Sequence, residues 1–335
     1  MKTNSDDLQL QLFQRIKNSL PSGISLADEV ADVLNITLDS AYRRIRGEKP
    51  LVFDEIFTLC TKFNISIDDI FNNKTKGESF LCRIIDANSL SFENYLKSLY
   101  NNITYIQTLG NPEITYFAKD IPIFQHFHIP ELAAFKLFFW SKTLIMLPEF
   151  ADKKFDCSQI SETVLEIGKN TLAVYNKIPS IEIWNEETVN SAIRQIEFYY
   201  TGGTIPKKDD ALMLLHSYDL LFQHIGKQAE RGCKYLPCSE PLYPNNYKFY
   251  LNEVIQGDNS IYVKSDTRKI SFTAFNVLSL MVSDEEHFCM KVESYLKTMM
   301  KKSMLLSEVS EKERNRFFNV LSDKIRITEE RIKNS

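Results

Sequence analysis

"SLADEVADVLNITLDSAYRRIRG" occupies residues 25–47, and its pattern predicts two short helices joined by a tight turn. Ser25 stands where the N-cap of the first helix is expected. The apolar face of this helix consists of Leu26, Val30, Val33 and Leu34. Asn35 comes next, and asparagine tolerates the left-handed backbone conformation that such a turn requires. Thr37 is then the expected cap of a second helix over residues 38–46.

The two sides of the helix over 38–46 differ in polarity. The side expected to face the core carries Leu38, Ala41 and Ile45. The opposite side carries Asp39, Tyr42, Arg43 and Arg46. A helix of this width fits the major groove of DNA, where an arginine can donate two hydrogen bonds to guanine. The positions expected to contact phosphates, which orient a protein without reading sequence, are Arg44, Arg46 and Lys49.

The flanking segments extend this pattern to a small helical domain. Apolar residues recur every four positions over residues 8–20, which predicts an amphipathic helix. Residues 52–63 carry the apolar face of a fourth helix, and residues 64–71 predict a short fifth one. We therefore expect residues 1–75 to form a five-helix helix-turn-helix domain that binds DNA.

A family resemblance supports this expectation. The stretch "LADEVADVLNITLDSAYRRIRGEKPLVFDEIFTLCTKFNISIDDIF" resembles the Cro/C1-type (XRE-like) helix-turn-helix family, and "AYRRIRGEKP" is similar to BetR-type domains. The resemblance covers residues 8–72. Ala31 matches the small residue of the family's second helix, Ala41 matches the buried position of its recognition helix, and Asn35 stands where glycine is most frequent. The resemblance implies a DNA-contacting role for Thr37, Asp39, Ser40, Tyr42, Arg43 and Arg46.

Arg44 departs from the family pattern, because many members carry an aliphatic residue there, and Ile45 is expected to take the second buried position. The plain alternative for the arginines is a solvated helix face paired with nearby carboxylates. The cap, the turn and the following helix favour DNA binding over that alternative. The acidic residues of the preceding helix, Asp28, Glu29 and Asp32, keep a role in protein contacts open.

The rest of the chain, residues 79–335, has a mainly helical pattern and follows the polar segment "NNKTKGES" at 72–79. Three alternating segments near 247–275 predict an antiparallel β-meander, and "FLCRII" at 80–85 and "EITYFA" at 113–118 are further strand candidates. We therefore expect a mainly α protein, in which the helix-turn-helix domain precedes a larger, mostly helical domain with a small meander. We recognise no family in this larger region.

The larger region carries no motif of a known catalytic or metal site. The sequence has no glycine-rich phosphate loop, no G-x-S-x-G and no H-E-x-x-H. Cys233 and Cys238 lack the matching ligand pair of a zinc site, and we interpret them as ordinary thiols. His126 and His128 alternate as residues of a half-buried strand would. We expect no enzyme activity, no cofactor and no metal.

Composition and charge exclude further classes of protein. The chain has 335 residues and a net charge of −4. Residues 1–77 carry 10 Lys and Arg against 11 Asp and Glu, and residues 78–335 carry 30 against 33, so neither part is a polycation. The most apolar run, residues 131–148, is interrupted by Lys136 and Lys142, which argues against a membrane span. The amino-terminal residues do not have the pattern of a signal peptide, so reduced cysteines and a cytoplasmic location are expected.

Three hypotheses for function follow. The first is a sequence-specific transcription regulator that binds double-stranded DNA as a homodimer, with residues 79–335 dimerising or sensing a small-molecule or protein effector. The second is a protein-interaction adaptor whose helix-turn-helix contacts another protein. The third is an enzyme with an appended DNA-binding module, because a fold alone does not exclude catalysis.

Overall fold

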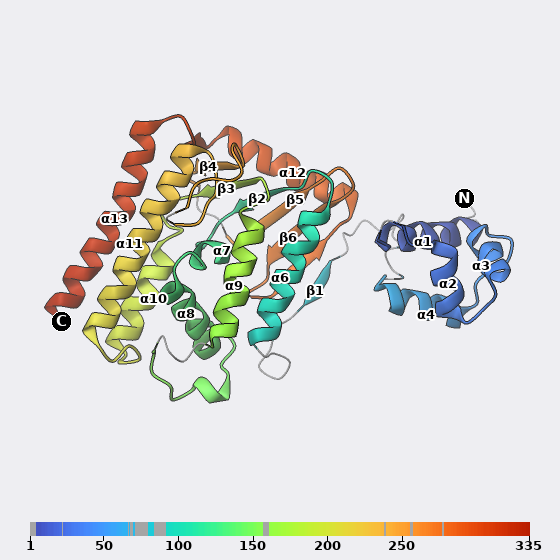
Figure 1. Ribbon diagram of the computed structural model, residues 1–335, viewed down its shortest axis with the longest axis horizontal. Coiled ribbons are helices and arrows are strands. Elements are labelled where there is room, and N and C mark those ends of the chain that lie inside the picture. Colours follow the sequence, from blue (N-terminus) through green and yellow to red (C-terminus); the bar gives the residue numbers. More distant parts are fainter. Residues whose placement is uncertain are drawn as a thin grey trace. The chain divides into compact units, whose positions relative to one another are not determined.

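The chain forms two compact units, Met1–Ser79 and Phe80–Ser335, and each is described by itself. In the computed structural model (Figure 1), the residues whose structure is described are 5–21, 23–65, 67, 70, 80–83, 92–156, 161–237, 239–254, 257–276 and 278–335. No helix within these ranges is both long enough and apolar enough to cross a bilayer.

The N-terminal unit is a small helical domain. Its helices are α1 (Ser5–Ser19), α2 (Leu26–Leu34), α3 (Leu38–Ile45) and α4 (Phe53–Phe63). Its core consists of Leu12, Phe13, Ile16, Val30, Ala41, Leu59 and Ile70. Half of the fifth helix predicted over 64–71, namely residues 66, 68, 69 and 71, lies outside the described residues. Of the other half, Ile67 and Ile70 are helical.

The expected caps around the turn are confirmed. The Ser25 hydroxyl accepts a hydrogen bond from the backbone N–H of Asp28, and Thr37 caps α3 in the same way through Ser40. Asn35 has a left-handed backbone with a φ of 51°, so the next N–H, that of Ile36, reaches back to the carbonyl of Ala31 at 2.9 Å. α4 ends by the same device at Asn64, with a φ of 53°.

The C-terminal unit is built on an eight-stranded mixed sheet within the described residues, with the strand order β1-β7-β6-β5-β2-β3-β4-β8. The strands are β1 (Leu81–Arg83), β2 (Glu113–Phe117), β3 (Ser180–Trp184), β4 (Tyr247–Leu251), β5 (Ser260–Lys264), β6 (Lys269–Ala274), β7 (Leu280–Ser283) and β8 (Met304–Leu305). β2, β3 and β4 are parallel to one another, and the remaining pairs are antiparallel.

This sheet corrects the predicted fold class of a mostly helical domain with a small meander. The antiparallel run is β1-β7-β6-β5-β2, whereas β4 pairs in parallel with β3 on the other side of β2. The sequence pattern does not reveal β3, because all five of its residues are buried and a strand covered on both faces does not alternate in polarity. The pattern places β4 in the meander, since strands adjacent in sequence usually pair, but here β4 pairs with β3. Of the two further strand candidates, the structure places β1 within 80–85 and β2 within 113–118.

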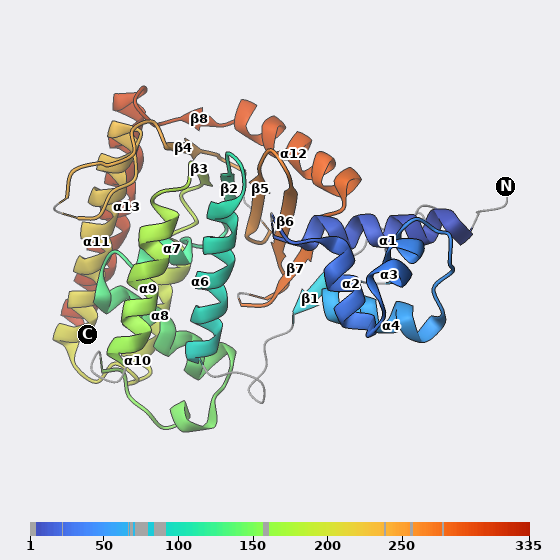
Figure 2. The same ribbon diagram turned by 45° about the vertical axis from the view of Figure 1, so that its right-hand side comes forward.

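Helices cover both faces of the sheet (Figures 1 and 2). They are α6 (Phe92–Thr108), α7 (Ile123–His126), α8 (Pro130–Phe139), α9 (Glu162–Tyr175), α10 (Asn190–Thr201), α11 (Lys208–Arg231), α12 (Glu286–Lys301) and α13 (Glu311–Asn334). α8 continues as a π-helical turn, Trp140–Leu144, and a 3-10 turn follows at Pro148–Phe150. α12 packs on one face through Cys289 and Leu296, and the other helices form the larger core on the opposite face.

Candidate nucleic-acid interface

α3 is anchored to the N-terminal unit through a side different from the expected one. Ala41 is fully buried, and Arg44 is only 5 % exposed. Leu38, expected in the core, is 47 % exposed, and Ile45 is half-buried. The helix is therefore rotated relative to the sequence prediction, so that Arg44, not Ile45, takes the second deeply buried position.

This rotation leaves most of the predicted contact residues on the surface. The exposed ones are Thr37, Asp39, Tyr42, Arg43, Arg46 and Lys49, and Ser40 is half-buried. Thr37 donates a hydrogen bond to the Ser40 hydroxyl at 3.1 Å, which orients both side chains at the start of α3. The surface around α3 thus combines a phenol ring, two guanidinium groups, one carboxylate and the hydroxyls of a threonine and a serine.

The exposed arginines share one acidic partner. Glu48 lies 3.1 Å from Nε of Arg46 and 4.0 Å from Nε of Arg43. All three side chains are about half-exposed, and ion pairs between such groups contribute about 0–1 kcal/mol. A phosphate or a guanine edge can therefore replace Glu48 at little cost.

Arg44 is held by a different carboxylate. Its Nη2 and Nε donate to the two carboxylate oxygens of Glu55, at 2.6 and 3.1 Å, and its Nη1 donates to the carbonyl of Ser40 at 3.2 Å. Glu55 also accepts from the backbone N–H of Val52 at 3.2 Å and so completes the cap of α4. The hydrogen bonds from Arg44 hold the pKa of Glu55 below its ordinary value. Arg44 therefore joins α3 to α4.

Gln9, a residue that the sequence interpretation did not single out, joins the C-terminal end of α3 and the loop after it to α1. Its Nε2 donates to the carbonyls of Arg44 and Lys49 at 2.7 and 2.8 Å, and its Oε1 accepts from the N–H of Leu51 at 2.9 Å. The only signal in the sequence is a polar residue next to the apolar stripe of 8–20. Gln9 and Glu55 together fix the helix and the loop that carry Arg43, Arg46 and Lys49.

The charge around α3 is mixed. The arginines at 43, 44 and 46 form their ion pairs with Glu48 and Glu55. The acids Asp28 and Asp32 of α2 are exposed, and Glu29 is half-buried. Asp39 lies in the first turn of α3, where a carboxylate is favourable beside the helix N-terminus. The positive charge is therefore concentrated at the C-terminal end of α3 and in the loop after Gly47.

The C-terminal unit buries a few charged side chains, among them Lys234 and Glu182. Nζ of Lys234 donates to the carbonyls of Tyr175 and Ile178 and to the hydroxyl of Ser180, each at 2.6 Å. The carboxylate of Glu182 accepts from Tyr175, Gln125 and Trp184. Burial alone lowers the pKa of Lys234, but three acceptor oxygens and the nearby Glu182 favour its charged form. This cluster ties the end of α9 to β3.

The prediction that His126 and His128 lie on a half-buried strand is wrong. His126 ends α7 and His128 lies just after it, so neither belongs to a strand, and both are buried. His126 contacts the Tyr218 hydroxyl at 3.1 Å, and the ring of His128 lies 4.6 Å from that of His224. Cys233 is a buried free thiol, and Cys238 lies outside the described residues. Among the residues that the structure describes, no three histidine, cysteine or acidic side chains gather as metal ligands would.

Comparison of the chain with models of protein families, with curated proteins and with solved structures finds no match in any of the three.

Proposed function

We propose that the protein is a cytoplasmic transcription regulator that binds double-stranded DNA sequence-specifically through α3. The observation that carries the proposal is the division of α3 into a fixed side and a free side. Ala41 and Arg44 hold the helix in the unit, while Tyr42, Arg43 and Arg46 are exposed. A short helix held in this way can enter the major groove without rearrangement of its own unit.

The contact residues divide into two roles. Tyr42 and Arg43, in the middle of α3, read base edges, with Thr37, Asp39 and Ser40 contributing at its start. Arg46 and Lys49, at the end of the helix and beyond it, contact phosphates. Arg44 acts through Glu55 as a positioning residue and keeps α3 at a fixed angle. We further propose that the C-terminal unit dimerises or responds to an effector, because one small domain with so few phosphate contacts binds weakly.

Selection of bound sequences from random duplexes by the full chain tests the proposal. We expect an enriched motif, and we expect Arg43→Ala to relax base preference at one position. Arg46→Ala and Lys49→Ala should weaken binding to all sequences alike and reduce the slope of log affinity against log salt by about 1 each. These differences follow because a lost base contact removes discrimination, whereas a lost phosphate contact removes counterion release.

Arg326→Ala is the matched control. Arg326 lies on α13, is exposed to a similar degree as Arg46 and also pairs with acidic neighbours. It should leave both the motif and the salt slope unchanged. An equal loss in the Arg43 and Arg326 variants, or the absence of any duplex binding at low salt, would contradict the proposal.

The adaptor alternative is supported by one observation. Val52, Phe53 and Phe57 of the N-terminal unit expose large apolar side chains, and exposed apolar patches mark protein contacts. An adaptor would still bind its protein partner after the substitution Arg43→Ala. It would not bind DNA duplexes even at low salt.

A further inference from the structure

Leu38 is an exposed aliphatic residue on the helix that carries the predicted DNA contacts. It is the first residue of α3 and is 47 % exposed, although its spacing predicts a core position. The described apolar side chains that pack around the core of the N-terminal unit include Ile36 and Ile45 on either side of it, but not Leu38. Packing within its own unit therefore does not explain a leucine at this position.

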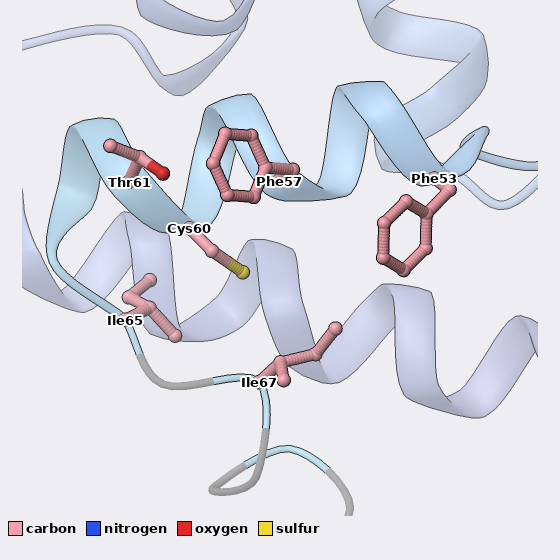
Figure 3. A pocket seen from close by; sticks show the side chains of 6 residues that line it. All are labelled: Phe53, Phe57, Cys60, Thr61, Ile65 and Ile67. Carbon is pink, nitrogen blue, oxygen red and sulfur yellow. The ribbon is translucent and has the colours of Figure 1, made fainter.

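The surroundings of Leu38 differ from those of the exposed aromatic residues of the same unit. Phe53 and Phe57 line a hollow beside α4 together with other apolar side chains (Figure 3). Leu38 instead lies among predicted contact residues, directly after Thr37 and four positions before Tyr42. Side chains four positions apart are neighbours on a helix surface. Leu38 and the half-exposed ring of Tyr42 thus form a short apolar strip on α3.

The turn that carries Leu38 has a fixed backbone. The Thr37 hydroxyl accepts a hydrogen bond from the N–H of Ser40 at 3.3 Å and donates one to the Ser40 hydroxyl at 3.1 Å. Ala41, which follows, is fully buried. Helices that read the major groove contact base edges with their N-terminal residues. A duplex bound at α3 therefore meets Leu38 in a defined position.

An aliphatic side chain suits one feature of the base edges in the major groove. The edges present hydrogen-bond donors and acceptors, and the C5-methyl group of thymine is the apolar group among them. Leucine placed against a donor or an acceptor would remove water from that group without replacing its hydrogen bond, which is unfavourable. Leucine placed against a methyl group removes apolar surface of both from water, which is favourable.

We propose that Leu38 is a specificity-determining residue that contacts the methyl group of a thymine in the bound sequence. The inference rests on the proposed DNA-binding function and deepens it. It adds a residue to the contacts named there, and it specifies the base that this residue reads.

Replacement of thymine by deoxyuridine in the selected duplex tests the inference, because the exchange removes only the methyl group. Each thymine of the motif is exchanged in turn, and the affinities of the full chain and of its Leu38→Ala variant are measured. At one position the exchange should weaken binding of the unaltered chain roughly fourfold, the value expected for one buried methyl group. Leu38→Ala should bind the thymine and deoxyuridine duplexes alike at that position.

Two further variants control for a loss of folding or of general affinity. Leu220→Ala is the matched control, because Leu220 lies on α11 and is 45 % exposed, and it should retain the full effect of the exchange. Leu38→Met keeps an apolar side chain of similar volume and should retain most of it. The slope of log affinity against log salt should be the same in all variants, because the phosphate contacts are unchanged.

The outcomes separate this inference from the proposed function. If the chain binds its motif, but no thymine is sensitive to the exchange or Leu38→Ala keeps the same sensitivity at every position, the inference fails and the proposed function stands. If the chain binds no duplex even at low salt, both fail.

Discussion

At the scale of single residues, Arg44 and Lys234 are charged side chains in positions where apolar ones would be expected. Each is tolerated because its donors are matched: Arg44 by Glu55 and the Ser40 carbonyl, and Lys234 by three oxygens at 2.6 Å. A buried charge without such partners costs several kcal/mol. The positions of the hydrogen-bond acceptors, and not the charge alone, therefore determine whether each side chain stabilises its unit.

Arg44→Ala should lower the free energy of unfolding of the N-terminal unit by roughly 1–3 kcal/mol, because it leaves Glu55 partly buried without its partner. Glu55→Gln should cost less, because glutamine can still accept the hydrogen bond from Val52. Hydrogen exchange of α3 and α4 amides in the full chain measures both. The exposed control Arg43→Ala should stay within about 0.5 kcal/mol, and a loss equal to that of Arg44→Ala would refute the positioning role of Arg44.

Lys234→Met should destabilise the C-terminal unit by roughly 3–5 kcal/mol. Methionine preserves most of the packing volume, but it leaves the two carbonyls and the Ser180 hydroxyl without their donor and Glu182 without a nearby positive charge. This loss of stability is measured by denaturant unfolding with tryptophan fluorescence as the signal, because both tryptophans, Trp140 and Trp184, are buried in this unit. Lys248→Met, on the exposed side of β4, should be nearly neutral, and a similar loss there would show that the effect is not specific to the buried amine.

At the scale of elements, the absence of a side chain at one position allows α9 to pack closely against the end of α7. Gly168 lies inside α9, and a Cβ added there would lie 2.5 Å from Cδ1 of Phe127. The glycine is therefore needed for contact between α9 and the end of α7, although glycine within a helix costs about 1 kcal/mol relative to alanine.

Gly168→Ala should consequently destabilise the C-terminal unit by about 1–3 kcal/mol, since overpacking outweighs the gain in helix propensity. Thermal unfolding monitored by tryptophan fluorescence is the measurement. Lys169→Ala, at the exposed neighbouring position, should leave the midpoint unchanged or raise it slightly. A rise in the midpoint for Gly168→Ala would mean that Phe127 can move away freely.

At the scale of the whole molecule, the two units differ in their response to acid. All five histidines lie in the C-terminal unit, and residues 1–79 contain none. Burial lowers the pKa of His126 to about 3, and it also lowers the pKa values of His128 and His224. Below the unfolded value near 6.5, the unfolded chain binds protons that the folded unit excludes.

The C-terminal unit should therefore lose stability as the pH falls below about 6.5, by up to about 1.4 kcal/mol per pH unit for each neutral histidine. Burial raises the pKa of Glu182, so the folded unit can bind one proton there that the unfolded chain does not bind. This uptake offsets at most the effect of one histidine. In the N-terminal unit, Glu55 has a lowered pKa, so its contribution is present above about 4.5 and is lost only at lower pH. Denaturant midpoints from tryptophan fluorescence between pH 7 and 5, with hydrogen exchange for the N-terminal unit, check this order. A C-terminal unit whose midpoint is independent of pH would contradict it.

The sequence by itself determined what depends on neighbours along the chain. The caps at Ser25 and Thr37, the left-handed Asn35 and the helices of the N-terminal unit follow from local hydrogen bonding and apolar spacing. The C-terminal sheet does not follow from such local interactions. β3 becomes a strand through pairing with β2 and β4, which lie more than 60 residues away on either side.

Only the tertiary structure decided which side of α3 is buried. Apolar periodicity selected Leu38 and Ile45, whereas Glu55, eleven residues after Arg44, supplies the carboxylate that allows an arginine into that position. The pairing of a buried charge is a property of two segments in contact. Helical period along one segment placed Tyr42, Arg43 and Arg46 on the outer side, but it could not reveal that Arg44 is buried and Leu38 exposed.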